Sequence, residues 1–423
     1  MQLDDYIEAL EPDEDAERRR LAREKSYAIT QYLEDFESRF ERVTRGQPLF
    51  GSTAPSIFVG RSNYPTVSTG LLSPVGNEDR AAEFATDSSW YRNGFSIEDV
   101  FQYRTGLLNA NRRSNVNVHD VWDGFVGVQR EVAIADRPVD VEIGLKKGLS
   151  LDLGLDSVAT PSGPRATAER ASLAENPHVP RPVEYVLSDD DWRAEGAMVY
   201  LYRRGFDVYE INRILSAGAL GEGAKRRLVP TRWSITAVDD VIGRYLRGTI
   251  SQSDSIDETQ VWSNEYMGNR YWIIMTPGRW EYELIEMKAP GSVWNPIPDD
   301  DLYIASDNED ESGRTGYVDG GTAGAYYAAR LGVLEYLSEI DRQAKALVIR
   351  HVSDDYWGPV GVWQVRESVR HAFGDIGATA PTFHLAIAQI LPHLPLTMSD
   401  LRRASTMVAG LQANLSDFMN TVK

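Results

Sequence analysis

The chain of 423 residues has no cysteine. This excludes disulfides, thiolate zinc sites and cysteine nucleophiles. No run of apolar residues approaches the about 18 that a membrane-spanning helix needs. The first residues are acidic, whereas a secretion signal has a basic stretch followed by an apolar one. Together these absences predict a cytosolic protein.

Lysine is also scarce. Only 7 of the 44 basic residues are lysines, against 63 acidic residues of which 34 are aspartates, and the net charge is −19. Short, strongly hydrated carboxylates keep a surface soluble where molar salt screens charges beyond about 3 Å. The composition is typical of a salt-loving organism, with an ordinary acidic cytosolic protein as the alternative. Because phosphate attraction is weak at high salt, the negative charge does not exclude DNA as a partner.

Turn residues and hydrophobic spacing divide the chain into three parts. Residues 1–45 are highly charged with apolar residues at helical spacing, which predicts an amphipathic helix. Residues 46–409 show strand and helix patterns without regular alternation. They predict a mixed α/β (α+β) body with an irregular mixed sheet and surrounding helices, and a candidate sub-boundary in a long loop at 154–182. Residues 410–423 predict a flexible tail.

Within the body, the spacing of apolar residues and the positions of turn residues predict individual strands and helices. Strands are expected near 126–135, 139–145, 183–187, 270–276, 279–288 and 345–351. Helices are expected near 190–203, 207–217, 235–247, 322–342, 361–373, 382–391 and 399–409. The run at 299–312 is rich in acidic residues and is interpreted as an insertion.

The tail places Gln412, Leu415, Phe418 and Met419 at positions 1, 4, 7 and 8 of one short segment. In a single tight helical turn these side chains share one side, so the apolar groups can enter one pocket while the glutamine amide hydrogen-bonds beside it. The segment resembles the PIP box, with which DNA replication and repair proteins bind the sliding clamp, PCNA. It departs from the usual pattern at Met419, where a second aromatic residue is common.

A structural interpretation of the same residues remains open. Leu411, Leu415, Phe418 and Val422 could continue the apolar stripe of the helix at 399–409. Gly410 favours a helix end at that point, and the polar residues that follow are weak helix formers.

The densest basic segment of the chain is 225–240. Arg232 could bind phosphate while Trp233 stacks on a base, and Ser234 or Thr236 could cap the following helix and present its amides to an anion. The alternative is a helix cap with internal arginine–aspartate pairs.

The motif at 58–61, Tyr64-Pro65, the run at 230–240 and the PIP-like terminus together resemble the archaeal Nre family of DNA repair proteins. The resemblance spans almost the whole chain. It implies a role in repair of DNA damage with the sliding clamp as partner, and it assigns no biochemical activity. Some relatives carry an N-terminal cysteine zinc module, which cannot be transferred to a chain without cysteine.

Two further functions stay open beside a clamp-recruited repair factor. One is an enzyme acting on nucleic acid or nucleotides, and the other is an adaptor whose body is a scaffold. The enzyme hypothesis requires a cleft that binds anions or nucleic acid, lined by Arg61, Tyr64, Arg232, Trp233, Asp239 and Asp240. No catalytic residue, metal site or cofactor is predicted, although His351 with Asp354 and Asp355 could form a metal corner.

Overall fold

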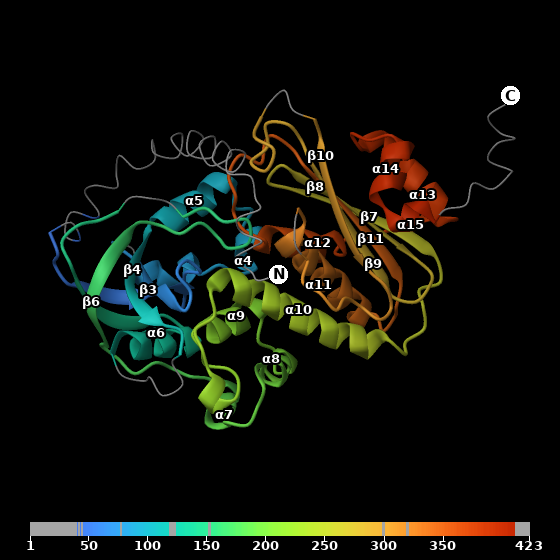
Figure 1. The fold of residues 1–423 in the computed structure, drawn as a ribbon. Coiled ribbons are helices and arrows are strands. Elements are labelled where there is room, and N and C mark those ends of the chain that lie inside the picture. Colours follow the sequence, from blue (N-terminus) through green and yellow to red (C-terminus); the bar gives the residue numbers. More distant parts are fainter. Residues whose placement is uncertain are drawn as a thin grey trace, which may run out of the picture. The chain divides into compact units, whose positions relative to one another are not determined.

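The computed structural model describes Phe40, Val43 and residues 45–76, 78–117, 124–150, 154–297, 301–318 and 321–410. The chain divides into two compact units (Figure 1). The first unit takes the described residues up to Ile242 together with Gly358–Gln364. The second takes Gly243–Trp357 and residues 365–410. Most of the predicted helix at 1–45, and the tail beyond Gly410, lie outside the described residues.

Six strands form a sheet in the first unit, in the order β1-β5-β6-β4-β3-β2. They are Leu49–Thr53 (β1), Ile57–Val59 (β2), Thr66–Pro74 (β3), Leu107–Asn115 (β4), Val139–Leu145 (β5) and Arg165–Leu173 (β6). β4 and β6 run parallel, and the other neighbours run antiparallel. In β5, Val139, Val141 and Ile143 are buried and the acidic residues between them are only half-buried. This alternation places one face of the strand against the core.

The first unit also contains helices, some of which pack on its sheet. They are η2 (Glu78–Phe84), α4 (Ser89–Arg92), α5 (Ile97–Thr105), α6 (Gly124–Ile134), α7 (Arg181–Ser188), α8 (Ala194–Arg203), α9 (Val208–Ser216), η3 (Gly223–Lys225) and the start of α10 (Thr231–Ile250). α6 packs its Val132 and Ala133 into a core with Leu71 and Ala110 of the sheet. The Thr69 hydroxyl of β3 also donates a hydrogen bond to the side chain of Gln129 in α6. Both contacts join α6 to the sheet.

The second unit contains a mixed sheet in the order β10-β9-β11-β8-β7-β12. Its strands are Thr259–Tyr266 (β7), Asn269–Thr276 (β8), Glu281–Lys288 (β9), Tyr303–Glu309 (β10), Lys345–Val352 (β11) and Ala378–Ala380 (β12). β11 lies parallel to β9 and antiparallel to β8. The central strands β8 and β11 contain continuous apolar runs, and the residues 346–349 of β11 are buried on both faces of the sheet. Such runs are typical of strands covered on both faces.

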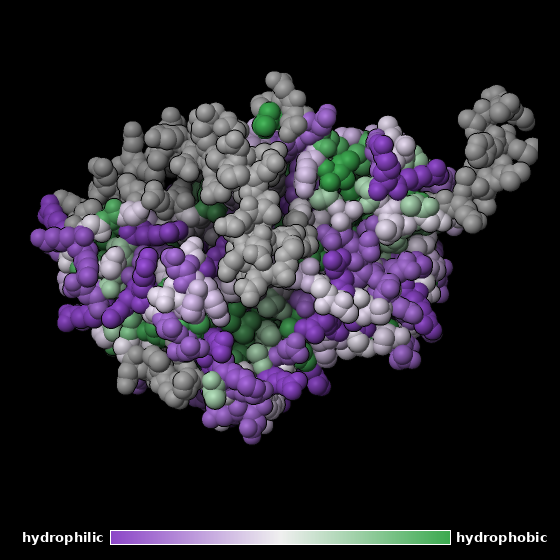
Figure 2. All heavy atoms as spheres, in the orientation of Figure 1, coloured by the Kyte–Doolittle hydropathy of each residue, from purple (hydrophilic) through white to green (hydrophobic). Residues whose placement is uncertain are grey.

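Helices cover both faces of this sheet (Figure 1). They are the rest of α10, α11 (Ala323–Glu339), α12 (Trp363–Ala372), α13 (Phe383–Ile390), η4 (Leu391–His393), α14 (Met398–Ala404) and α15 (Thr406–Ala409). Tyr326 of α11 meets Tyr282 on one face, with ring centroids 5.1 Å apart. Ile387 and Val408, from α13 and α15, join the core on the other face. Hydrophilic residues cover most of the described surface visible in Figure 2. No helix in the described ranges is long and apolar enough to cross a membrane.

A buried carboxylate fixes the last helix to the second sheet. Glu283 of β9 is fully buried and accepts hydrogen bonds from the Ser405 hydroxyl at 2.5 Å, the Thr406 amide at 2.7 Å and the Met407 amide at 3.1 Å. These amides belong to the start of α15, where a helix leaves its N–H groups unpaired. α15 then ends at Gly410, as the sequence predicts.

The α+β class predicted from the sequence is confirmed, as are the strand expected at 139–145 and the helices and strands expected between 190 and 288 and between 322 and 391. The single helix expected at 399–409 is two helices, α14 and α15, because Ser405 between them is extended (φ −120°, ψ 124°). The strands expected at 126–135 and 183–187 are wrong, because these residues form α6 and α7. α6 is buried along most of its length, so its apolar run carries no clear helical period. The loop expected at 154–182 contains β6, and the acidic insertion contains β10.

Candidate functional site

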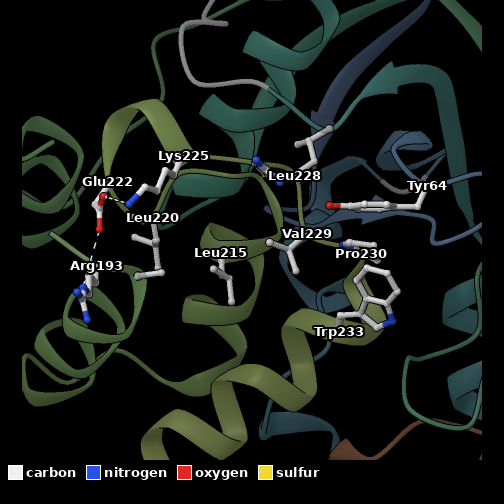
Figure 3. Close-up of a pocket in the computed structure, with 13 residues that line it drawn as sticks. Tyr64, Arg193, Leu215, Leu220, Glu222, Lys225, Leu228, Val229, Pro230 and Trp233 are labelled. Atoms are coloured by element: carbon white, nitrogen blue, oxygen red, sulfur yellow. Dashed lines mark hydrogen bonds and ion pairs between the residues drawn. The ribbon is translucent and has the colours of Figure 1, made fainter. Parts of the chain in front are cut away.

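A pocket of about 340 Å³ opens on the first unit. The loop after β2, the segment before α10 and the start of α10 all contribute to it, as does the start of α8. Figure 3 shows aromatic rings at one end and charged groups at the other. The wall between the two ends is apolar and is formed by Leu215, Leu220, Leu228, Val229 and Pro230. We call this the aromatic pocket.

A glycine and a buried arginine support the wall of the aromatic pocket. Gly218 has a φ of 68°, and a Cβ at this position would lie 2.7 Å from the carbonyl of Arg227, so only glycine fits without strain. The guanidinium of Arg130 donates hydrogen bonds to the carbonyls of Ala217 and Gly218, each at 3.4 Å. Burial lowers the pKa of Arg130 to about 10, which leaves it protonated at neutral pH. The wall therefore rests on a rigid support.

The first turn of α10 is joined to the end of β2. The amide of Val59 donates a hydrogen bond of 2.9 Å to the hydroxyl of Thr231, the first residue of α10. The hydroxyl of Ser234 donates to the side-chain oxygen of Asn212 in α9 at 2.5 Å. The first bond holds the end of β2, from which the loop with Tyr64 continues, beside α10, and the second joins α10 to α9.

Tyr64 and Trp233 form the aromatic end of the pocket. Their ring centroids lie 5.5 Å apart with an angle of 50° between the planes. Tyr64 is 45% exposed and Trp233 is 38% exposed. In Figure 3 the Tyr64 hydroxyl points toward the apolar wall. Within the described ranges neither this hydroxyl nor the Trp233 indole N–H has a hydrogen-bond partner, so both polar groups and part of each ring face remain accessible to a ligand.

Three cations line the rest of the pocket, and two of them share one acid. Lys225 donates a hydrogen bond to Glu222, and Arg193 lies 3.9 Å from the same carboxylate. The hydrogen bond from Lys225, with the charge of Arg193, holds the pKa of Glu222 below its ordinary value, so Glu222 stays ionised. Arg227 is exposed and forms no ion pair with any described residue. It is therefore the cation best placed to meet an added anion.

The six predicted cleft residues are distributed as follows. Tyr64 and Trp233 come together in the aromatic pocket. Arg232 immediately precedes Trp233 in α10. It pairs with the Asp156 carboxylate at 2.7 Å and donates to the Ser157 hydroxyl at 2.8 Å, so its charge is already compensated. Arg61 is exposed on the loop before Tyr64. Asp239 is fully buried and Asp240 half-buried along α10, and both interact with other groups of the protein. None of these four residues lines the pocket.

Sequence reasoning missed the residues that complete the pocket from other elements. Two of them, Arg193 and Leu215, are distant in the chain from the basic segment at 225–240, and Glu222 lies just before that segment. The glycine-rich run at 218–223 was the available signal, since its turns fold the segment 224–230 back along α9. Chemically, the assembled pocket can stack a planar ring at its aromatic end and hold an anion at Arg227.

The predicted corner at His351 lies in the second unit. Burial, assisted by the charge of Arg270, lowers the pKa of His351, so the imidazole stays neutral at neutral pH. Among the described residues, no group of three or more His, Asp or Glu side chains is arranged to hold a metal ion. The aromatic pocket is therefore the candidate functional site.

Comparison with known proteins identifies the family. The profile of the archaeal Nre N-terminal domain matches residues 21–295, and that of the C-terminal domain matches residues 309–418. No solved structure matches the chain.

Individual relatives support the same family assignment. The chain is 64% identical over 421 residues to a DNA repair protein NreA of Haloferax volcanii, covering 99% of this chain and 100% of the relative. It is 41% identical over 319 residues to an NreA of Archaeoglobus fulgidus, covering 75% of this chain and 78% of that one. An NreB of the same organism is 35% identical over 379 residues, covering 89% and 94%. The chain therefore belongs to the archaeal Nre family.

Proposed function

We propose that this protein is a DNA repair factor that is recruited to the sliding clamp through its C-terminal tail. The repair role is supported by the 64% identity, over nearly the whole of both chains, to a relative named as a DNA repair protein. At this identity, over both family domains, the same fold and the same kind of site are expected. The named relatives supply no reaction, and we propose none.

The recruitment step rests on the spacing of Gln412, Leu415, Phe418 and Met419. The described body ends at Gly410, which closes α15. Glu283 holds α15 to the second sheet, so the PIP-like residues follow an anchored point by only two positions. A peptide motif beyond an anchored helix can bind a partner while the body remains folded. We therefore treat tail and body as independent modules.

The enzyme alternative, with an anion-binding cleft around Arg61 and Arg232, has less support. Arg232 is already paired with Asp156. The carboxylate in the aromatic pocket, Glu222, is engaged by Lys225 and kept ionised, which does not suit a general acid. The pocket favours binding over chemistry.

Survival after DNA damage tests the proposed function. An archaeal strain lacking its own Nre gene is complemented with the full chain, with a chain ending at Gly410 or with a Phe418→Ala variant. We expect the full chain to restore survival and the two tail variants to restore much less. An Asn420→Ala variant, altered beside the motif, serves as the matched control. If the full chain restores nothing, the repair role is wrong; if all variants restore survival equally, the tail is not needed.

A further inference from the structure

We infer that the aromatic pocket binds an unpaired nucleotide of single-stranded DNA. The base would stack on the Tyr64–Trp233 pair, and its phosphate would meet Arg227. This inference rests on the proposed repair function for the choice of DNA as the ligand. The pocket geometry then selects which form of DNA is bound.

The aromatic pair selects unpaired bases. In a duplex, each base face is already covered by its neighbours, whereas a single strand can offer a free face to a protein ring. The 5.5 Å separation of the two rings leaves no room for a base between them, because a sandwiched base needs about 3.5 Å on each side. The base must therefore stack on the exposed side of the pair. The free Tyr64 hydroxyl and Trp233 N–H are then available to its polar edge or to the sugar–phosphate backbone.

The charged side chains of the pocket determine where the sugar–phosphate backbone of the DNA can lie. At the end of the pocket that holds Glu222, the cations Lys225 and Arg193 are already engaged by this carboxylate, so a phosphate there would have to compete with an internal ion pair. Arg227, which follows Glu222 and precedes α10 along the chain, also lines the pocket, is exposed, and has no ion-pair partner among the described residues. A phosphate at Arg227 thus gains a charge contact without displacing an internal one.

The platform is preorganised. The loop that carries Tyr64 is closed by hydrogen bonds from the Gly60 amide to the Ser68 carbonyl at 2.7 Å and from the Thr66 amide to the Asn63 carbonyl at 2.9 Å. α10 fixes Trp233 in its first turn. Because neither ring must be ordered when the ligand arrives, little of the stacking energy is lost to conformational entropy. Stacking also persists in molar salt, where phosphate contacts weaken.

Fluorescence anisotropy with the full-length protein tests this inference. The probes are a labelled 12-nucleotide single strand of mixed sequence and the blunt-ended duplex that the same labelled strand forms with its complement. We expect tighter binding to the single strand. Trp233→Ala should weaken that binding by about 5- to 100-fold, as expected for loss of one stacked base, while Trp233→Phe retains most of it. Arg227→Ala should reduce the slope of log affinity against log salt by about 0.7.

Matched controls separate the site from general effects. Phe50→Ala removes another exposed aromatic ring of the first unit, 64% exposed on β1, and should leave binding unchanged. Thermal melting of each variant establishes that it is folded, and Tyr64→Ala replaces Trp233→Ala if the latter unfolds. Equal affinity for the single strand and the blunt-ended duplex, or unchanged affinity in the folded variants, would overturn the inference. Clamp binding is measured separately, so failure here leaves the proposed recruitment standing.

Discussion

The aromatic pocket of the first unit and the charged cluster beneath α11 in the second unit use the same residue types in opposite ways. In the cluster, Arg330 and Glu309 pair at 2.7 Å with 2% and 0% of their side chains exposed. Glu309 also accepts hydrogen bonds from the Trp280 indole at 2.8 Å and the Tyr326 hydroxyl at 3.2 Å. Both oxygens of this carboxylate thus accept hydrogen bonds from partners inside the protein. In the pocket, by contrast, Arg227, Tyr64 and Trp233 leave polar groups open.

Arginine beside aromatic rings is therefore not by itself a ligand site. A buried charge is tolerated only when its partners are present. We therefore assign the cluster a role in stabilising the fold rather than in binding a ligand. An exposed cation and exposed rings carry no such penalty and add little to stability. The two regions should therefore respond differently to the same substitution, and this contrast can be tested.

The largest effect is expected from breaking the buried pair. Arg330→Ala leaves Glu309 buried without its cation, and we expect the free energy of unfolding to fall by about 3–5 kcal/mol. Arg227→Ala, the matched change in the pocket, should alter it by less than about 0.5 kcal/mol. Denaturant unfolding of both variants measures the difference. Equal losses would show that the two regions are not distinguished by burial.

Removing the charge of Glu283, which holds the start of α15, should lower the free energy of unfolding by less and act more locally. Glu283→Gln keeps the shape of the side chain but removes the charge that accepts the Thr406 and Met407 amides. We expect a loss of about 1.5–3 kcal/mol, the range for hydrogen bonds to a charged group. Hydrogen exchange should become faster in α14 and α15 before the rest of the second sheet. Unchanged exchange in these helices would contradict the role given to Glu283.

Salt should act on the surface more than on either buried region. The 63 acidic residues repel one another at low ionic strength. We expect the denaturation midpoint to fall when the protein is moved from molar to millimolar salt. A midpoint independent of salt would count against the salt-adapted surface that the composition predicts.

The smallest effect concerns pH. Because burial lowers the pKa of His351 below its ordinary 6.5, the unfolded chain binds this proton more readily than the folded one. The stabilisation is complete above pH 6.5 and is lost as the pH falls toward the lowered pKa. His351→Gln should flatten this part of the curve of unfolding free energy against pH. An unchanged slope between pH 7 and 5 would show that His351 does not contribute.

The sequence predicted features that depend on local pattern. Helices such as α9 and α13 carry clear periodicity with capping residues, Asp207 and Thr382, at their starts. It failed at α6, whose valines and nearly complete burial resemble a strand, and at β6, which lies inside the loop expected at 154–182. Trp233 and Tyr64 could be proposed as site residues from their motifs. Arg193 and Leu215 could not, because only the folding of α8 and α9 against the segment 220–230 brings them to the pocket.

Calorimetric titration of the sliding clamp tests the central claim most directly. The full chain, the Phe418→Ala variant and a chain ending at Gly410 are titrated under identical salt. We expect Phe418→Ala to lose about 2–4 kcal/mol of binding free energy, the usual cost of removing a buried aromatic anchor. The shortened chain should show no binding, and the melting temperature of the body should stay nearly unchanged. Equal clamp affinity for the full and the shortened chain would contradict recruitment through the tail.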